Sequence, residues 1–356
     1  MATNVSVSPY KARRSVGSYV VPVLAVLVLA GVVFLLAKNI QHDGFSYFME
    51  ISFIGLTNGA VYALVALGYT LVYGILELIN FAHGDVFMLG GMISATILAE
   101  FNLQASAPIG SLLPAIIVSL GVSMMICGLL NATIERVAYK PLRNAPRLAP
   151  LITAIGMSFI LQDIALAWKG PEYVSLPAIL PHSEVFRVSL GSSEIVYTWN
   201  KLIVVIITVP VLLALMWLIR STKQGKAMRA TAQDQDAAAM MGINVNRTIS
   251  FTFLIAGALA GAAGLLYALY FTQVRYDQGF QLGLIAFTAA VLGGIGNLPG
   301  AVLGALVIGF IQAFNEGLSW HSPGSDWTQS IVFSILILIL VFRPEGLLGE
   351  RTPEGG

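Results

Sequence analysis

Ten apolar stretches, each long enough or nearly long enough to cross a lipid bilayer, constrain this chain more than any other feature. A membrane-spanning helix needs about 20 mainly apolar residues, and somewhat fewer where neighbouring helices shelter a break. The stretches cover residues 20–37, 48–74, 82–99, 110–134, 150–168, 201–219, 248–271, 281–295, 300–317 and 327–342. Because the pair after residue 280 is short and rich in glycine, we expect an all-α membrane protein with eight to ten spans.

The composition excludes a soluble enzyme, a nucleic-acid-binding protein and a disordered regulator. Of the 356 residues, 57% are hydrophobic and 10% are charged, whereas a soluble domain carries about 25% charged residues. The single cysteine, Cys127, lies in an apolar stretch, and the four histidines are scattered. We therefore expect no disulfide framework, no metal site and no cofactor.

The positively charged residues predict the orientation, because cytoplasmic loops of membrane proteins are enriched in Lys and Arg. Fourteen of the 19 Lys and Arg residues precede the first span or follow the fourth, sixth or last span. We therefore expect these segments and both termini to be cytoplasmic. The expected organisation is a cytoplasmic tail (1–19), a transmembrane domain (20–342) with the first span retained, and a second cytoplasmic tail (343–356).

The long external connection, about residues 169–199, contains several Pro and Gly residues. Its later part, Val185 to Leu190 followed by Gly191-Ser192-Ser193, is typical of a β-hairpin.

The long internal connection, about residues 221–247, contains the most specific feature of the sequence. Lys226 to Met241 are sixteen residues of mostly strong helix formers, closed by Gly242, and four of them are charged. They are too polar to cross the bilayer, so we expect one helix at or beyond the cytoplasmic surface. Its small side chains and two methionines suit either a groove in a soluble partner or the lipid surface.

The second span carries a polar face. Asn58, Tyr62, Tyr69 and Tyr73 fall within about 60° of arc on one side of a helix. Such a face inside a bilayer points away from lipid. It either lines a translocation path or packs against another helix, and the two roles are compatible.

A polar insertion, Glu77 to Asp85, separates the second span from the third. One interpretation is a capped inner turn, in which Asn80 or His83 caps the next helix and Asp85 lies in its first turn. The other is a gate or a proton relay formed by these three residues.

Two glycine-rich groups follow, around Gly257–Gly264 and Gly293–Gly304. Close helix packing is the simpler interpretation, and broken helix near a substrate path is the alternative. The inner turns at Asn80–Gly84 and Asn297–Gly300 also resemble each other, which indicates an internal duplication of the kind common in transporters.

Long segments resemble the permease subunits of ABC importers for branched-chain amino acids. They are GLTNGAVYALVALGYTLVYGILELINFAHGDVFMLGG at residues 55–91, residues 229–309 including ATAQDQDAAAMMGINVNRTISFTF and AVLGGIGNLPGAVLGALVIG, and FRPEGLLG at 342–349. In that family an acidic-Ala-Ala-x-x-x-Gly segment is the coupling helix that docks on the ATPase. The resemblance assigns this role to Asp236, Ala237, Ala238, Met241 and Gly242, with Lys226 and Arg229 beside them.

The resemblance also implies the partners of the chain. These are a second related permease subunit, two ABC ATPase subunits and a periplasmic or extracellular substrate-binding protein that docks on the external face, all in the bacterial cytoplasmic membrane with its lipid. Because the phosphate-binding motif G-x-x-x-x-G-K-[ST] is absent from the sequence, ATP hydrolysis is expected on the separate subunits.

Alternatives stay open at this point. The substrate could be urea, a short amide, a sugar or a nucleoside, because pore residues of this class discriminate poorly. A different class, an ion-driven carrier or channel acting alone, is disfavoured by the few acidic residues inside the spans. An intramembrane hydrolase would need a Ser, Asp or His constellation at a common depth, and none is evident.

Overall fold

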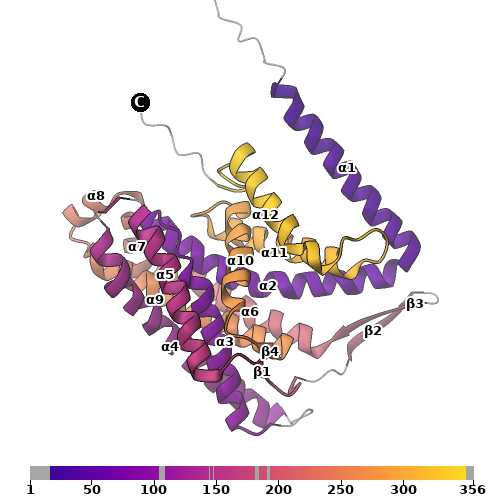
Figure 1. Cartoon of the computed structure of the whole chain (residues 1–356), viewed down its shortest axis with the longest axis horizontal. Helices are drawn as coiled ribbons and strands as arrows, with labels where there is room; N and C mark the ends of the chain where they lie inside the picture. The colour runs from indigo at the N-terminus through magenta and orange to yellow at the C-terminus, as the bar shows by residue number, and fades with distance from the viewer. Residues whose placement is uncertain are drawn as a thin grey trace, which may run out of the picture.

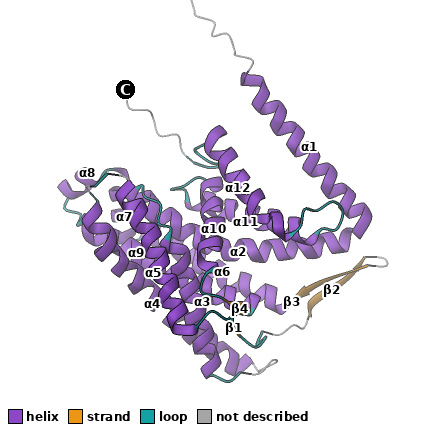
Figure 2. Ribbon diagram, in the orientation of Figure 1, coloured by secondary structure: helices purple, strands orange, loops and turns teal. Residues whose placement is uncertain are grey.

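The computed structural model describes residues 17–103, 109–143, 145–146, 148–180, 184–190 and 193–349, and there it confirms the all-α organisation (Figure 1 and Figure 2). Each predicted span corresponds to one helix. They are α1 (Gly17–Asp43), α2 (Phe45–Leu76), α3 (Ala82–Glu100), α4 (Ile109–Ile134), α5 (Leu148–Lys169), α6 (Trp199–Ser221), α9 (Val245–Phe271), α10 (Gln278–Gly293), α11 (Leu298–Gly317) and α12 (Ser325–Phe342). Most of the predicted N-terminal tail and the end of the C-terminal tail lie outside the described residues, as do Lys11, Arg13, Arg14, Arg147 and Arg351 of the positive segments.

Among the described residues, eight helices are long and apolar enough to cross a membrane, and α10 is a shorter apolar helix of 16 residues. These helices are buried to very different degrees. In α2, α3 and α9 the most apolar windows are 83%, 78% and 72% buried, whereas in α5, α6 and α12 they are 22%, 22% and 11% buried. The first three helices therefore form the centre of the bundle, and the last three present apolar side chains to lipid or to other subunits.

Glycines bring the central helices into backbone contact. A Cβ on Gly261 of α9 would lie 2.6 Å from the carbonyl oxygen of Ser123 in α4. A Cβ on Gly304 of α11 would lie 2.1 Å from the carbonyl oxygen of Ala289 in α10. No side chain fits at such distances, so the close-packing interpretation of both glycine-rich groups is confirmed at these positions.

The internal connection differs from its prediction. It forms two helices, α7 (Lys223–Gln233) and α8 (Gln235–Met240), which are separated by the extended backbone of Asp234. The side chain of Asp234 accepts a hydrogen bond of 2.9 Å from the N–H of Ala237 and so begins a new helix. The prediction of one continuous helix was wrong because helix propensity, averaged over the segment, does not reveal a cap inside it.

Two short antiparallel strand pairs lie at the other end of the bundle, away from α8 (Figure 1). β2 (Glu184–Leu190) pairs with β3 (Ser193–Thr198), which confirms the predicted hairpin. β1 (Val174–Ser175) pairs with β4 (Gln273–Val274) and so joins the α5–α6 connection to the α9–α10 connection. We call this the outer end, and the end that carries α7 and α8 the inner end.

At the inner end, α4 continues into a π-helical turn, η1 (Glu135–Tyr139), and a 3₁₀ turn, η2 (Lys140–Leu142). The buried Glu135 carboxylate accepts hydrogen bonds from Arg143 and, at 2.6 Å, from the hydroxyl of Ser250 in α9. The segment after α12 is also ordered here, because Leu347 and Leu348 donate their N–H groups to the last carbonyls of α10 at 2.8 and 3.0 Å. Part of the predicted C-terminal tail is therefore packed on the bundle.

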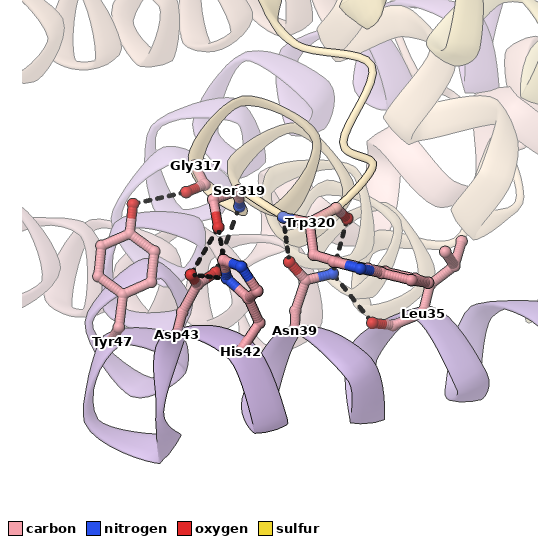
Figure 3. Close-up of polar contacts among 8 residues, drawn as sticks. All are labelled: Leu35, Asn39, His42, Asp43, Tyr47, Gly317, Ser319 and Trp320. Atoms are coloured by element: carbon pink, nitrogen blue, oxygen red, sulfur yellow. Dashed lines mark hydrogen bonds and ion pairs between the residues drawn. The ribbon is translucent and has the colours of Figure 1, made fainter.

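At the outer end, α1 contacts the bundle through its C-terminal part, from about Phe34 onward, and its earlier part diverges from the bundle (Figure 1). The Asn39 amide accepts a hydrogen bond of 2.9 Å from the Trp320 N–H and donates one of 3.2 Å to the Trp320 carbonyl (Figure 3). Asp43 accepts from Ser319, and the Tyr47 hydroxyl donates to the Gly317 carbonyl at 2.6 Å. We call these contacts the outer clasp; they join the α1–α2 turn to the α11–α12 connection.

Candidate functional site

Hydrogen bonds define both ends of α8. Asp234 caps its start, and Gly242 follows its end with a φ of 83°, a left-handed conformation that glycine adopts easily. The N–H of Ile243 donates to the Ala238 carbonyl at 3.1 Å, and the N–H of Gly242 donates to the Ala239 carbonyl at 3.0 Å. This pair of bonds is the Schellman pattern, so the predicted closure by Gly242 is confirmed.

α8 and its C-cap, Met241, expose two large apolar side chains beside polar ones. Met240 and Met241 are 82% and 83% exposed, more than any other exposed large hydrophobic side chain in the described part of the chain. Asp236 is also exposed, whereas Ala238 is buried against the bundle. Methionine side chains are flexible and polarizable, and they are common on surfaces that bind other proteins.

The two basic residues predicted beside the coupling motif lie in different environments. Lys226 is exposed on α7. The guanidinium of Arg229 instead donates to the carbonyl of Ile219 at 2.9 Å, in the last turn of α6. It also lines a cavity of about 620 Å³ with Arg220 and the α10–α11 turn. Gly225 also lies against the end of α6, since a Cβ at this position would be 2.3 Å from the Ile219 carbonyl oxygen. α7 is therefore packed closely on the end of α6.

The polar face of α2 packs inside the chain. Asn58, Tyr62 and Tyr69 are buried, and Tyr73 is half-buried. The hydroxyl of Tyr62 donates to Gln312 of α11 at 2.6 Å. The packing role is therefore present at these positions, while the translocation role stays a prediction.

The inner turn before α3 is not capped by a side chain, so the predicted cap at Asn80 or His83 was wrong. The Asn80 side-chain oxygen instead accepts a hydrogen bond of 2.7 Å from the hydroxyl of Tyr139 in η1. The His83 ring is buried against α2, where it meets the Tyr69 ring edge-on with centroids 4.8 Å apart. Both side chains are committed to neighbouring helices, because the fold brings those helices to the turn.

Asp85 lies in the first turn of α3, as predicted, and its carboxylate is the centre of a buried polar cluster. Ser158 of α5 donates to it, and Gln162, one turn further along α5, donates to it at 3.1 Å. Ser158 is the eleventh residue of the 22 in α5, so the cluster lies about 15 Å from either end of that helix. Asp85 therefore lies beside the middle of α5, although it begins α3. A charged side chain at such a position is costly to bury without partners, and both partners come from α5, which is otherwise peripheral.

Four further polar residues were not predicted from the sequence: Ser158, Gln162, Gln312 and Gln235. The first two are polar residues four apart in an apolar span, a spacing that places both on one helical face and could have indicated the contact. Gln235, which donates to the Ile75 carbonyl of α2 at 3.0 Å, carries no such signal.

The outer end carries charged pairs instead. The guanidinium of Arg187 lowers the pKa of the Glu184 carboxyl beside it on β2. Arg275 pairs with Asp277 and lies over the ring of Tyr173, 5.0 Å from its centroid. Among the described residues, no three His, Cys, Asp or Glu side chains are placed to hold a metal ion.

The comparison with protein families identifies the chain. A family model described as branched-chain amino acid transport system / permease component matches residues 51–341. The chain belongs to this family. The high-affinity branched-chain amino acid permease protein LivH of Escherichia coli (strain K12) is 39% identical over 318 residues, which cover 88% of this chain and 99% of LivH. BraD of Pseudomonas aeruginosa, of the same description, is 40% identical over 303 residues, covering 84% of this chain and 95% of BraD.

One of the more distant relatives belongs to a sugar importer. The fructose import permease protein FrcC of Rhizobium meliloti is 24% identical over 261 residues, which cover 70% of this chain and 66% of FrcC. As a member of the branched-chain amino acid permease family, the chain is a multi-pass membrane subunit of an ABC importer and not an enzyme; ATPase activity is on separate subunits.

Proposed function

We propose that this permease moves branched-chain amino acids across the cytoplasmic membrane by alternating access, driven by ATP hydrolysis on partner subunits. The observation that carries the proposal is α8, a capped helix at the inner end whose Met240 and Met241 are 82% and 83% exposed. The substrate class is supported by the names of LivH and BraD, which match almost their whole length, against 66% of FrcC.

The assembly contains a second, related permease subunit, two ABC ATPase subunits and a substrate-binding protein. The exposed apolar faces of α5, α6 and α12 give a second permease a surface within the membrane. The connection at 169–199, with β2 and β3, gives the binding protein a surface at the outer end. Both termini are cytoplasmic, a placement supported by the distribution of Lys and Arg.

The ATPase contacts α8 and the turn after it. Asp236, Ala237, Ala238, Met241 and Gly242 shape this surface, and the exposed Lys226 extends it along α7. Arg229 contributes from the permease side, because its guanidinium holds α7 on α6.

The translocation path follows the polar face of α2, with Tyr73 at its inner end and Asn80, His83 and Asp85 as the inner gate. The buried Asn58 side-chain oxygen accepts no hydrogen bond from the described residues. Buried polar atoms are rarely left in this state. This atom therefore supports a second conformation in which α2 faces a hydrated path.

The coupling assignment is tested with Gly242→Ala and Asp236→Leu in the reconstituted importer. Uptake per ATP hydrolysed should fall at least fivefold in both, because the first strains the turn after α8 and the second changes its exposed face. Gly296→Ala is the matched control, since Gly296 also has a positive φ, of 94°, and open space at its Cβ, but lies in the α10–α11 turn. Unchanged coupling in the two α8 variants would refute the assignment.

The substrate is tested by thermal unfolding of the cognate binding protein with leucine, isoleucine, valine, urea, amides, fructose and nucleosides. Stabilisation by the branched-chain amino acids alone is expected. Uptake into proteoliposomes that contain only this subunit, driven by a proton or sodium gradient, would instead support the ion-driven alternative.

A further inference from the structure

The segment from α7 to α9 is attached to three different membrane helices. Arg229 and Gly225 hold α7 on the end of α6. The Asn244 side chain accepts a hydrogen bond of 3.0 Å from the Arg247 N–H and so joins the turn after α8 to the start of α9. The third attachment, at the start of α8, leads to α2.

α7 also packs against α2, and one side-chain hydrogen bond joins the start of α8 to the same helix. The Gln235 amide nitrogen donates to the carbonyl oxygen of Ile75 at 3.0 Å. Ile75 lies in the last turn of α2, where carbonyls lack a donor from their own helix. The Tyr73 carbonyl, two residues earlier, accepts a hydrogen bond of 2.7 Å from the N–H of Glu77 at the end of the same helix. The Ile75 carbonyl instead accepts its hydrogen bond from the Gln235 side chain.

α2 is the helix best placed to carry a displacement across the molecule. Its 32 residues correspond to about 48 Å. Its inner end meets Gln235, its middle carries the polar face, and its first turn reaches the outer clasp through Tyr47 (Figure 3). A movement of α8 that is passed to Ile75 can therefore reach both the path and the outer end.

We propose that Gln235 is the positioning residue that transmits the movement of α8 to α2. This inference rests on the proposed coupling function and assigns one part of it to a side chain that lies outside the acidic-Ala-Ala motif. Gln235 acts on α2 only, whereas α6 and α9 follow α7 and α8 through their own contacts. Loss of the hydrogen bond should therefore leave ATPase docking intact and weaken the response of the path.

The test is Gln235→Met, which retains the length of the side chain and removes its donor, in the complete importer with ATPases and binding protein. ATPase association should equal that of the wild type, and thermal stability should fall only slightly, as expected for one lost hydrogen bond. Uptake per ATP hydrolysed should fall about fivefold, the change expected from one lost hydrogen bond. Gln233→Met is the matched control and should show no loss, and Gln235→Lys, which restores a donor of similar reach, should recover coupling.

Spin labels at Glu77 and Ala239, both exposed, give a second measurement that retains Gln235, Met240 and Met241. The distance between the labels should be the same in the nucleotide-free and the ATP-bound, hydrolysis-blocked importer, because α8 and the end of α2 move together. A changed distance, or normal coupling in Gln235→Met, would overturn the inference. If the variants Gly242→Ala and Asp236→Leu still uncouple the importer in that case, the proposed function survives; if they do not, it fails as well.

Discussion

Charged side chains are usually exposed and large apolar ones are usually buried. The Asp85 cluster and the α8 region each depart from one half of this rule. Asp85 places a carboxylate in the interior of the bundle, and α8 places two methionines in solvent. The carboxylate has hydrogen-bond donors from Ser158 and Gln162, so the chain itself compensates its burial. The methionines have no such compensation within the chain. We infer that the first region is stabilised by the chain itself and that the second is available to bind a partner.

The largest loss of stability is expected from Asp85→Ala. The variant removes the acceptor of the buried Ser158 and of the half-buried Gln162, which costs about 3 kcal/mol of unfolding free energy. Denaturant unfolding in lipid nanodiscs measures this change. Asp163→Ala is the control, because Asp163 is exposed on α5, the helix that carries Ser158 and Gln162. Equal losses of unfolding free energy in the two variants would contradict the expected difference between a buried and an exposed carboxylate.

Gly264→Ala tests the packed centre without changing a polar group. A Cβ at this position would lie 2.4 Å from the backbone nitrogen of Gly91, whereas a Cβ on Gly121 would meet nothing within 4 Å. We expect a loss of about 2 kcal/mol for Gly264→Ala, because backbone atoms cannot move aside. Gly121→Ala should unfold at the same denaturant concentration as the wild type or at a higher one. If Gly264→Ala is as stable as Gly121→Ala, the close packing of the central helices does not limit stability at this position.

Tyr62→Phe should have a smaller effect. It removes the hydrogen bond of 2.6 Å to Gln312 but retains the ring, so about 1 kcal/mol of unfolding free energy is expected to be lost. Tyr73→Phe, on the same face of α2 but half-buried, should be close to neutral. A double-mutant cycle with Gln312→Ala measures the interaction directly, and additive losses would show that the two side chains do not interact.

The smallest change in stability is expected from the double variant Met240→Ser, Met241→Ser. Exposed positions usually alter the unfolding free energy by less than about 0.5 kcal/mol. The affinity for the ATPase subunit should nevertheless fall at least tenfold, because exposed apolar anchors dominate such interfaces. Val137→Ser is the control, because Val137 is 72% exposed on the π-helical turn at the same end. If the binding affinity is unchanged in the double variant, α8 is not the binding surface.

Much of the fold could be predicted because apolar runs report the spans directly. All ten predicted segments correspond to helices, and the hairpin in the external connection was also predicted. The break at Asp234 was missed, since a cap depends on the local backbone and the predicted helix had no visible interruption. The predicted caps at Asn80 and His83 failed because Tyr139 and Tyr69 compete for the same side chains from distant parts of the chain.

The amino-acid sequence alone indicates that this protein crosses the membrane many times, and that one helical segment between the spans is too polar to cross it. Both follow from local composition, because about 20 apolar residues in succession favour the bilayer wherever they occur, and charged residues do not. The sequence did not indicate that Ser158 and Gln162 compensate Asp85, or that Gln235 connects α8 to α2. These contacts join residues about 75 to 160 positions apart, and only the packing of the helices decides which distant polar groups meet.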